Sequence, residues 1–339
     1  MAIESIPYVE LFTDEPVEAR HYLAEHLGFR PFAAAGETSV ALRNGPVVVV
    51  VTAPSRSGDP IERYLEAHGS GIADVAMSST DVGGDRARAI AAGATPAGGT
   101  AVGGFGPVRH TLVAAHAEPL PPDRGWQPAG PAAGPGGSLA IRALDHVAVC
   151  LPGGTLQSTA DFYGAALGLG RYSSEYIEVG TQAMDSVVVR SSSGGVTFTL
   201  IEPDETHTAG QIDEFLRNHG GAGVQHLAFL VEDIVTAVRR ATAGGLPFLS
   251  TPDSYYEMLT SRLGHLAESI DDLRETNVLA DRDEWGYLLQ IFTRSPYPRR
   301  TLFFELIQRH DARGFGSANI KALYEAVERD RARDAARAR

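Results

Sequence analysis

Apolar positions along the chain alternate between two spacings, which predicts strands followed by helices. Residues 6–29 begin with a strand-like apolar run and continue with apolar positions three and four residues apart, as in a helix. Residues 144–170 repeat this order and end, like the first segment, near a Leu-Gly pair. Runs rich in valine, isoleucine, threonine and phenylalanine at 45–54, 185–191 and 196–203 predict further strands.

This order of elements recurs, which indicates a duplicated chain. Residues 64–77 and 85–98 match 215–229 and 234–248, because each pair predicts a helix, a glycine-rich turn, a strand and a second helix. The repeating unit is β-α-β-β-β, and we expect four copies stacked around shared sheets. The fold class is therefore predicted as α+β, with two halves that are each built from paired βαβββ modules around a cupped sheet.

A segment dense in proline, glycine and alanine separates the two halves. Residues 117–138 lack periodicity and are predicted to be a linker. We therefore place a first domain at residues 1–116 and a second at 139–330. The charged end, residues 331–339, is predicted to be a solvated tail.

Composition narrows the possible partners and the possible metal ligands. The net charge of -13 argues against nucleic acid or an anionic membrane as the main partner. No apolar run approaches the ~20 residues of a membrane span, and the first residues do not resemble an export signal. The single cysteine, Cys150, excludes an internal disulfide and favours the cytoplasm. A metal site would therefore use histidines and carboxylates.

Three candidate metal ligands lie at matching places in the second half. His146 and His226 each fall in the first strand of a module, and Glu305 falls in the last long strand. Strands that repeat in this way can converge on one cavity. Two imidazoles and one carboxylate leave about three of six octahedral positions open, which suits iron(II) that must bind substrate and O2. A structural zinc site would instead need a closed set of four ligands.

Each residue alone also has an ordinary structural interpretation. A histidine in a strand is more often a hydrogen-bonded structural residue than a ligand. Glu305 needs a cation, because an unpaired buried carboxylate is costly and no basic residue adjoins it on its face of the strand. Aligning the halves places Tyr8, Asp74 and approximately Ala115 at the three ligand positions. The first half has therefore lost the triad, which predicts a single metal site, in the second half.

Four motifs resemble those of the 4-hydroxyphenylpyruvate dioxygenase family. They are GVQHLAF (223–229), DRDEWGYLLQIFT (281–293), LFFELIQR (302–309) and GFGSANIKALYEAVE (314–328). The resemblance spans nearly the whole chain. It implies two vicinal-oxygen-chelate domains, of which only the second binds Fe(II), through His146, His226 and Glu305. It also implies 4-hydroxyphenylpyruvate and O2 as substrates, and a homodimer.

Two activities occur in the family, and they differ in the carbon that is oxidised. Enzymes that attack the ring form homogentisate, and they usually read Asn-Phe-Lys in the last helix and Pro-x-Asn-Glu-Pro in a strand near the phenol. This chain reads Asn319-Ile320-Lys321 and Thr199-Leu200-Ile201-Glu202-Pro203. Both departures match the branch that hydroxylates the benzylic carbon. We therefore predict formation of 4-hydroxymandelate and CO2, with homogentisate formation as the alternative.

The same resemblance indicates which residues surround the substrate. The predicted substrate contacts are Ser186, Thr199, Ile201, Gln211, Gln290, Phe292, Phe303, Phe315 and Ile320. The predicted catalytic residues are Ile320, Gln290 and Tyr324. Gln290 and Gln211 could orient polar groups, Ser186 and Thr199 could bind the phenol, and the phenylalanines could flank the ring. By pattern alone, Ile320 is an ordinary residue on the apolar face of a helix. A non-catalytic binding module and a ring-cleaving extradiol dioxygenase remain as further alternatives.

Overall fold

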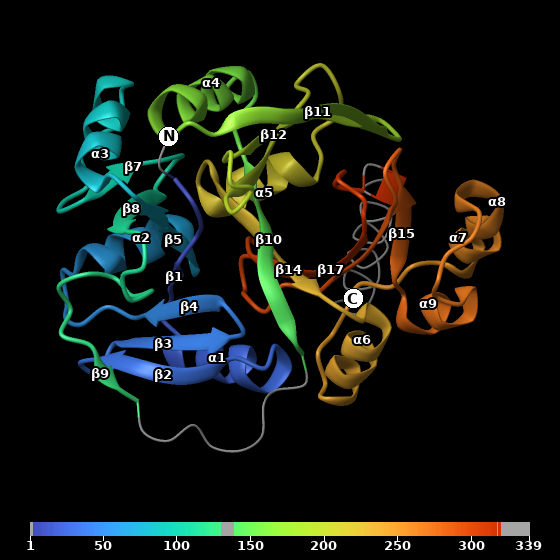
Figure 1. The fold of residues 1–339 in the computed structure, drawn as a ribbon, viewed down its shortest axis with the longest axis horizontal. Helices are drawn as coiled ribbons and strands as arrows, with labels where there is room; N and C mark the ends of the chain where they lie inside the picture. The colour runs from blue at the N-terminus through green and yellow to red at the C-terminus, as the bar shows by residue number, and fades with distance from the viewer. Residues whose placement is uncertain (1–2, 130–138, 317, 320–339) are drawn as a thin grey trace, which may run out of the picture.

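Two curved sheets, one from each half of the chain, form the protein. The computed structural model describes residues 3–129, 139–316 and 318–319. Figure 1 shows the first half, in blue to cyan, beside the second half, in green to red. Within the described residues, the strand order is β6-β8-β5-β1-β4-β3-β2-β9 in the first sheet, where β7 also pairs with β8. The order is β11-β12-β13-β10-β14-β17-β16-β15 in the second.

The first half contains nine of the described strands. They are β1 (Val9–Phe12), β2 (Arg30–Ala35), β3 (Ser39–Asn44), β4 (Val47–Thr52), β5 (Gly71–Val75), β6 (Met77–Ser79), β7 (Ala101–Gly103), β8 (Arg109–Ala114) and β9 (Gln127–Pro128). Its helices are α1 (Pro16–His21), which continues as a π-helical turn (Tyr22–His26), α2 (Pro60–His68) and α3 (Val82–Ala91).

The second half contains eight of the described strands, generally longer than those of the first. They are β10 (Ile141–Cys150), β11 (Gly170–Val179), β12 (Gln182–Arg190), β13 (Thr197–Pro203), β14 (Gly223–Val231), β15 (Leu279–Arg282), β16 (Tyr287–Phe292) and β17 (Phe303–His310). Its helices are α4 (Leu156–Leu167), α5 (Gln211–His219), α6 (Ile234–Ala243), α7 (Asp253–Glu257), α8 (Leu259–Leu263) and α9 (Ile270–Thr276).

The modular order predicted from the sequence is present in three of the four modules. The β-α-β-β-β order begins at β1, at β10 and at β14, and the last module carries α7, α8 and α9 as an insertion beside β15 (Figure 1). The second module differs, because β6 follows β5 directly and only the short β7 and β8 follow α3. The α+β class and the duplicated architecture are confirmed.

Local chemistry sets where the helices begin and end. The Asp59 side chain accepts a hydrogen bond from Ile61 N at the start of α2, and Pro60 occupies the first turn, where it needs no donor. The Asp233 side chain caps α6 in the same way, through Thr236 N. At the end of α4, Gly168 adopts the left-handed conformation that stops a helix.

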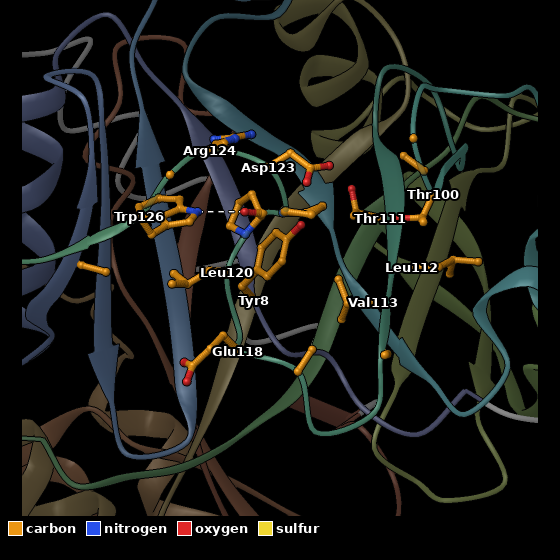
Figure 2. A pocket seen from close by; sticks show the side chains of 18 of the residues that line it. Tyr8, Thr100, Thr111, Leu112, Val113, Glu118, Leu120, Asp123, Arg124 and Trp126 are labelled. Carbon is orange, nitrogen blue, oxygen red and sulfur yellow. Dashed lines mark hydrogen bonds between the residues drawn. The ribbon is translucent and has the colours of Figure 1, made fainter.

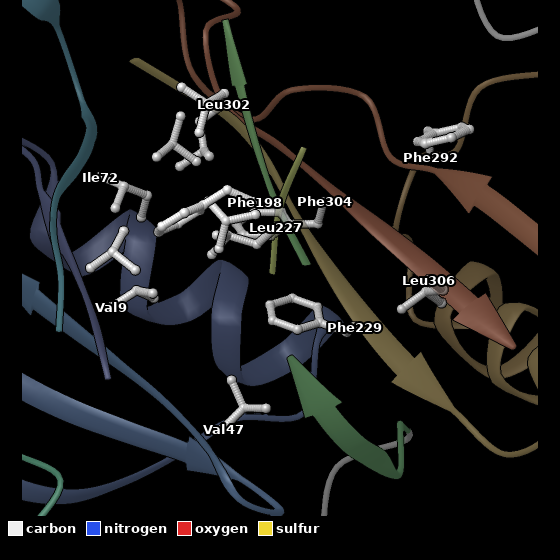
Figure 3. Close-up of a cluster of buried hydrophobic side chains, with 14 of the residues drawn as sticks. Val9, Val47, Ile72, Phe198, Leu227, Phe229, Phe292, Leu302, Phe304 and Leu306 are labelled. Carbon is white, nitrogen blue, oxygen red and sulfur yellow. The ribbon is translucent and has the colours of Figure 1, made fainter. Parts of the chain in front are cut away.

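A hydrophobic core joins the two halves. Figure 3 shows Val9 and Ile72 from the first sheet close to Phe198, Leu227 and Phe304 from the second. Burial of each such side chain stabilises the fold by roughly 1.5–3 kcal/mol.

Polar and aromatic contacts reinforce this junction. The ring of Phe29 lies 5.6 Å from that of Phe229, and Tyr22 stacks on Phe304 at 5.7 Å. His110 Nε2 accepts a hydrogen bond of 2.7 Å from the Tyr163 hydroxyl. The sheet faces that carry Val9 and Leu227 therefore contribute to one shared core.

The register of the strands corrects one part of the repeat alignment. Glu10 pairs with Asp74 in the first sheet, and Ala148 pairs with His226 in the second. Asp74 therefore occupies the position of His226. Tyr8, two residues before Glu10, occupies the position of His146. In the first sheet Leu112 pairs with Met77, and at the equivalent place in the second sheet Leu306 pairs with Phe229. The first-half position equivalent to Glu305 is consequently Thr111. Ala115, four residues further on, was the wrong counterpart.

Residues 117–129, the described part of the predicted linker, pack against the first half. Arg124 donates two hydrogen bonds to Glu10, and β9 pairs with β2. Leu120 and Trp126 pack against the cluster that contains Tyr8. Figure 2 shows these side chains around Tyr8. This segment, hereafter the strap, therefore lies along one side of the concave face of the first sheet. The domain boundaries themselves stay predictions. None of the described helices is long and apolar enough to cross a membrane.

Candidate metal centre

The three predicted ligands meet on the concave face of the second sheet. His146 is on β10, His226 on β14 and Glu305 on β17, three strands that lie side by side. Their ligand atoms all lie within 4.8 Å of one another, and all three side chains are buried. Glu305 Oε2 lies 3.4 Å from His146 Nε2 and 3.2 Å from His226 Nε2.

The alternation of each strand explains why these side chains share one face. Successive residues of a strand point to opposite faces of the sheet. Val147, Leu227 and Phe304, which neighbour the three ligands in the sequence, are buried in the core between the halves. His146, His226 and Glu305 must then point into the cup. The apolar neighbours thus fix the register that brings the ligands together.

Charge is concentrated in this site, and each group shifts the pKa of the others. Burial by itself would raise the pKa of Glu305, but the two histidines lower it to about 2. Burial would lower the pKa of His146, but Glu305 and Asp145 outweigh it and raise that pKa to about 9. Burial keeps the pKa of His226 below its ordinary value. The site therefore pairs the charged carboxylate of Glu305 with a His146 side chain that readily binds a positive charge, either a proton or a metal ion.

Each imidazole is oriented by the residue that precedes it. His146 Nδ1 donates to Asp145 Oδ1 at 2.9 Å, and His226 Nδ1 donates to Gln225 Oε1 at 3.1 Å. Both Nε2 atoms are left facing Glu305. Metal-binding histidines commonly make such a bond through the other ring nitrogen, which fixes the tautomer and the ring orientation. The donor set thus fits a divalent metal ion with open coordination positions.

Gln290 connects Glu305 to the start of the last helical segment. Its Nε2 donates to Glu305 Oε1 at 2.8 Å, and its Oε1 accepts from Asn319 Nδ2 at 3.0 Å. Gly316 packs directly on this amide, because a Cβ atom there would lie 1.9 Å from Gln290 Oε1. Gly316 also has φ +76°, so both the backbone and the space require glycine. The Gly-Phe-Gly motif therefore positions Gln290.

A cavity of about 50 Å³ lies beside the three ligands. Six of the predicted substrate residues line it: Ser186, Thr199, Ile201, Gln290, Phe292 and Phe315. Thr199 Oγ1 is buried and has no hydrogen-bond partner within the described part of the chain, so it can bind a polar group of a ligand. The Phe315 ring stands perpendicular to that of His146, with 5.2 Å between the ring centroids, and so narrows the cavity.

Other predicted substrate residues lie elsewhere. Gln211 is the first residue of α5 and does not line the cavity. Phe303 stacks on His226 with ring centroids 4.8 Å apart, but it is not among the residues that line the cavity. Their predicted contacts with the substrate stay predictions. Ile320 and Tyr324 lie outside the described residues, so their predicted roles stay predictions.

Sequence reasoning missed the residues that support the ligands. Asp145 and Gln225 immediately precede the two histidines, and a polar residue next to each ligand was the available signal. Arg309 is 164 residues from Asp145 in the chain and yet donates two hydrogen bonds to it. The remaining lining residues that were not predicted are Ser173, Glu175, Ile177, Met184 and Val188.

The amino-acid sequence of this chain is similar to those of one family of known proteins. Residues 143–291 match the model of the Glyoxalase/Bleomycin resistance protein/Dioxygenase superfamily. A 4-hydroxyphenylpyruvate dioxygenase from Aspergillus fumigatus is 31% identical, over 96% of this chain and 92% of the relative. One from Neurospora crassa is 32% identical, over 93% and 88% of the two chains.

A solved structure shows stronger similarity. A triple mutant of 4-hydroxymandelate synthase from Streptomyces coelicolor is 55% identical, covers 98% of this chain and 100% of its own, and superposes with a TM-score of 0.89. A fusion protein of a xylose isomerase-like TIM barrel with 4-hydroxyphenylpyruvate dioxygenase is 26% identical, over 96% of this chain and 52% of its own, with a TM-score of 0.77.

Proposed function

Since the chain belongs to the 4-hydroxyphenylpyruvate dioxygenase family, we propose that it is an iron(II)-dependent enzyme that converts 4-hydroxyphenylpyruvate and O2 into 4-hydroxymandelate and CO2. The observation that carries the choice of product is the identity of 55% to a 4-hydroxymandelate synthase over nearly the whole chain. Dioxygenases that match over a similar length are 31–32% identical.

The proposed iron ligands are His146, His226 and Glu305. Bound iron(II) would supply open positions for a chelating keto acid and for O2, together with the electrons that activate O2. Hydrogen bonds from both histidines to Asp145 and Gln225 keep Nε2 free to ligate. Gln290 donates a hydrogen bond to Glu305 Oε1, so Glu305 Oε2 is the oxygen that faces the two histidines.

The shape of the cavity would orient the substrate ring. Thr199 and Ser186 are hydroxyl groups on β13 and β12 that can bind the phenol, while Ile201 and Phe292 provide apolar walls. Ligand pockets usually measure about 300–1,000 Å³. The cavity is about 50 Å³, so side chains such as Phe315 must move when the keto acid binds.

Product choice would follow from which substrate carbon lies near the reacting oxygen. Ile201 stands where ring-attacking relatives usually carry an asparagine, and it offers no hydrogen bond to the phenol. A ring that is held less firmly at its phenol end can tilt and bring the benzylic carbon forward. A displacement of about 1 Å can change a rate about 100-fold, which is sufficient to decide between two carbons.

The stoichiometry is balanced without any outside reductant. The substrate loses its carboxyl group as CO2, and its keto carbon becomes the carboxylate of the product. One oxygen atom enters that carboxylate and the other enters the benzylic hydroxyl group. The buried site excludes water, which limits side reactions of the activated oxygen.

Formation of homogentisate is the second candidate, because the curated relatives quoted above are dioxygenases. Oxygen uptake and product identification with iron-loaded protein separate these activities. The proposal expects one CO2 released for each O2 consumed. Absence of oxygen uptake would instead indicate a non-catalytic binding protein. We also propose a cytoplasmic homodimer, of which sedimentation velocity tests the subunit count.

A further inference from the structure

The first half contains an open cavity at the position equivalent to the metal centre. Its volume is about 1070 Å³, and it is lined by Tyr8, which precedes β1, by β2 and β8, by the 97–101 loop and by the strap. Tyr8 and Thr111, at the positions of His146 and Glu305, both face this cavity (Figure 2). The duplicated scaffold thus has a second concave site, without the metal ligands but not filled by side chains.

The floor of this cavity is an ion network whose charges cancel. Glu10 and Asp74 are fully buried. Glu10 accepts two hydrogen bonds from Arg124, at 2.5 and 2.9 Å, and one from Arg109 at 3.1 Å. Asp74 accepts one from Arg109 at 2.9 Å and two from Thr111. The two carboxylates therefore pair with two guanidinium groups. Apolar side chains of similar volume would often stabilise a protein as much as such a buried ion network does. Stability alone does not explain it.

The Tyr8 hydroxyl group lies beside this network but is not hydrogen-bonded to it. Its hydroxyl is buried and has no hydrogen-bond partner in the part of the chain that the structure describes. Burial and the nearby Asp74 hold the pKa of Tyr8 well above its ordinary value, so the group stays neutral and can donate. A buried donor without a partner costs free energy that a ligand oxygen would recover.

The walls of the cavity suit an aromatic ring. Tyr8 stands between Trp126 and Leu120 of the strap and Val113 of β8 in Figure 2. The indole N–H of Trp126 already donates to Pro121 O at 2.8 Å, so what the ring offers a ligand is its apolar face. Flat apolar walls with a few polar groups at one end are typical of small-molecule sites.

We propose that this cavity binds a neutral aromatic molecule that carries a hydroxyl or carbonyl oxygen. The ring would lie among Tyr8, Trp126 and Leu120, and the oxygen would accept the Tyr8 hydrogen bond. An anionic ligand is disfavoured because the guanidinium charges are already neutralised and because Glu118 and Asp123 are exposed carboxylates of the same lining. The proposal does not depend on the reaction in the second half.

Tryptophan fluorescence can test this site directly. The chain has two tryptophans, and Trp285 lies in the second half, half exposed. A Trp285→Phe variant therefore leaves Trp126 as the only reporter. Titration with 4-hydroxybenzyl alcohol should change its emission saturably, and the anion 4-hydroxybenzoate should bind more weakly. Adding Tyr8→Phe, which removes only the hydroxyl group, should weaken binding of the alcohol about tenfold.

Controls separate this site from the other possible explanations. The unfolding midpoint of the Tyr8→Phe protein should stay close to that of its parent, which shows that the fold is intact. Thr199→Phe changes only the metal-site cavity and should leave the titration unchanged. The proposal is overturned by a titration without saturation, by equal binding in Tyr8→Phe, or by a response that Thr199→Phe abolishes. The proposal is also overturned if the Trp126 emission changes with protein concentration and not with ligand concentration. That result would mean that a second copy of the chain covers the cavity.

Discussion

Arg309 holds Asp145 through two hydrogen bonds directly behind the metal centre. Arg309 Nε and Nη2 each lie 2.7 Å from an oxygen of Asp145, and that carboxylate also accepts from His146. The same guanidinium donates to Gly314 O at 2.6 Å and lies 5.2 Å from the centroid of the Phe315 ring. One side chain thus connects the orientation of a metal ligand to the loop that narrows the cavity.

Replacing Arg309 with methionine should weaken metal binding without removing a ligand. His146 would keep Asp145, but Asp145 would lose the ion pair that fixes its position. Loss of such a supporting residue typically lowers metal affinity about 10–100-fold. Cobalt(II) titration followed by visible absorption measures the affinity and also reports the ligand geometry.

An exposed arginine provides the matched control for that experiment. Arg171 pairs with Asp161 on the surface, where the two side chains are 42% and 74% exposed. Arg171→Met should leave the cobalt affinity unchanged, since exposed ion pairs contribute little. Equal affinities in the Arg309→Met and wild-type proteins would contradict the assigned role.

Gly316→Ala should reduce activity by displacing Gln290. The new Cβ would lie 1.9 Å from Gln290 Oε1, so the amide must move away from Glu305 and Asn319. We expect kcat/KM to fall by about 100-fold, as for other displacements near 1 Å. Steady-state oxygen uptake with the iron-loaded protein measures the change.

Gly36→Ala separates this displacement from backbone strain. Gly36 also has a positive φ, +58°, but no atom lies within 4 Å of a Cβ built there. Both variants should lose about 1–2 kcal/mol of unfolding free energy from the left-handed backbone. Only Gly316→Ala should lose activity, and a similar loss in both would show that strain alone is responsible.

The sequence was sufficient to predict that His146, His226 and Glu305 converge on one site, but not which residues hydrogen-bond to them. The nearly equal spacing of His146, His226 and Glu305 in repeated modules carried that prediction. Arg309 could not be paired with Asp145, because long-range contacts depend on how the strands align in space. The choice of Ala115 over Thr111 failed for a related reason: local similarity between segments does not fix strand register.

The strap shows a second limit of sequence reasoning. Proline and glycine made residues 117–138 resemble a linker, because such residues disfavour regular structure. Arg124 nevertheless neutralises the buried Glu10, and Trp126 packs beside Tyr8. An arginine and a tryptophan within a linker-like run were the available signals. Their partners lie more than a hundred residues away in the chain, and only the fold brings them together.

Substitution of two of the residues that differ from the ring-attacking branch should change the product. Ile201→Asn and Ile320→Phe together should raise the ratio of homogentisate to 4-hydroxymandelate about tenfold or more, which corresponds to ~1.4 kcal/mol between the two barriers. Ile177→Val, also in the cavity wall, should leave the ratio unchanged. Chromatography of the reaction mixture gives the ratio, and an unaltered ratio in the double variant would refute the role of cavity shape.

His110 should make the fold less stable in mild acid. Burial lowers its pKa from 6.5 to about 4, so between these values the unfolded chain binds a proton that the folded chain excludes. Stability from this group is therefore complete above about pH 6.5 and is lost as the pH falls towards 4. At pH 5 the loss is about 2 kcal/mol relative to pH 7.

Urea unfolding at pH 7 and pH 5 checks this effect. A His110→Gln variant should be less stable at pH 7 but should lose about 2 kcal/mol less than the wild type between the two pH values. His265→Gln, at an exposed position, should leave the pH dependence unchanged. Wild-type pH dependence in His110→Gln would mean that other groups, such as His219, account for the acid sensitivity.

Identification of the product is the most direct test of the proposed function. Iron(II)-loaded protein is supplied with 4-hydroxyphenylpyruvate and O2, and the products are separated by chromatography against authentic standards. Glu305→Gln, which removes one proposed ligand charge, serves as the inactive control. The predicted result is 4-hydroxymandelate as the main product of the wild type and none from the variant. Homogentisate as the main product, or equal turnover by Glu305→Gln, would contradict the account.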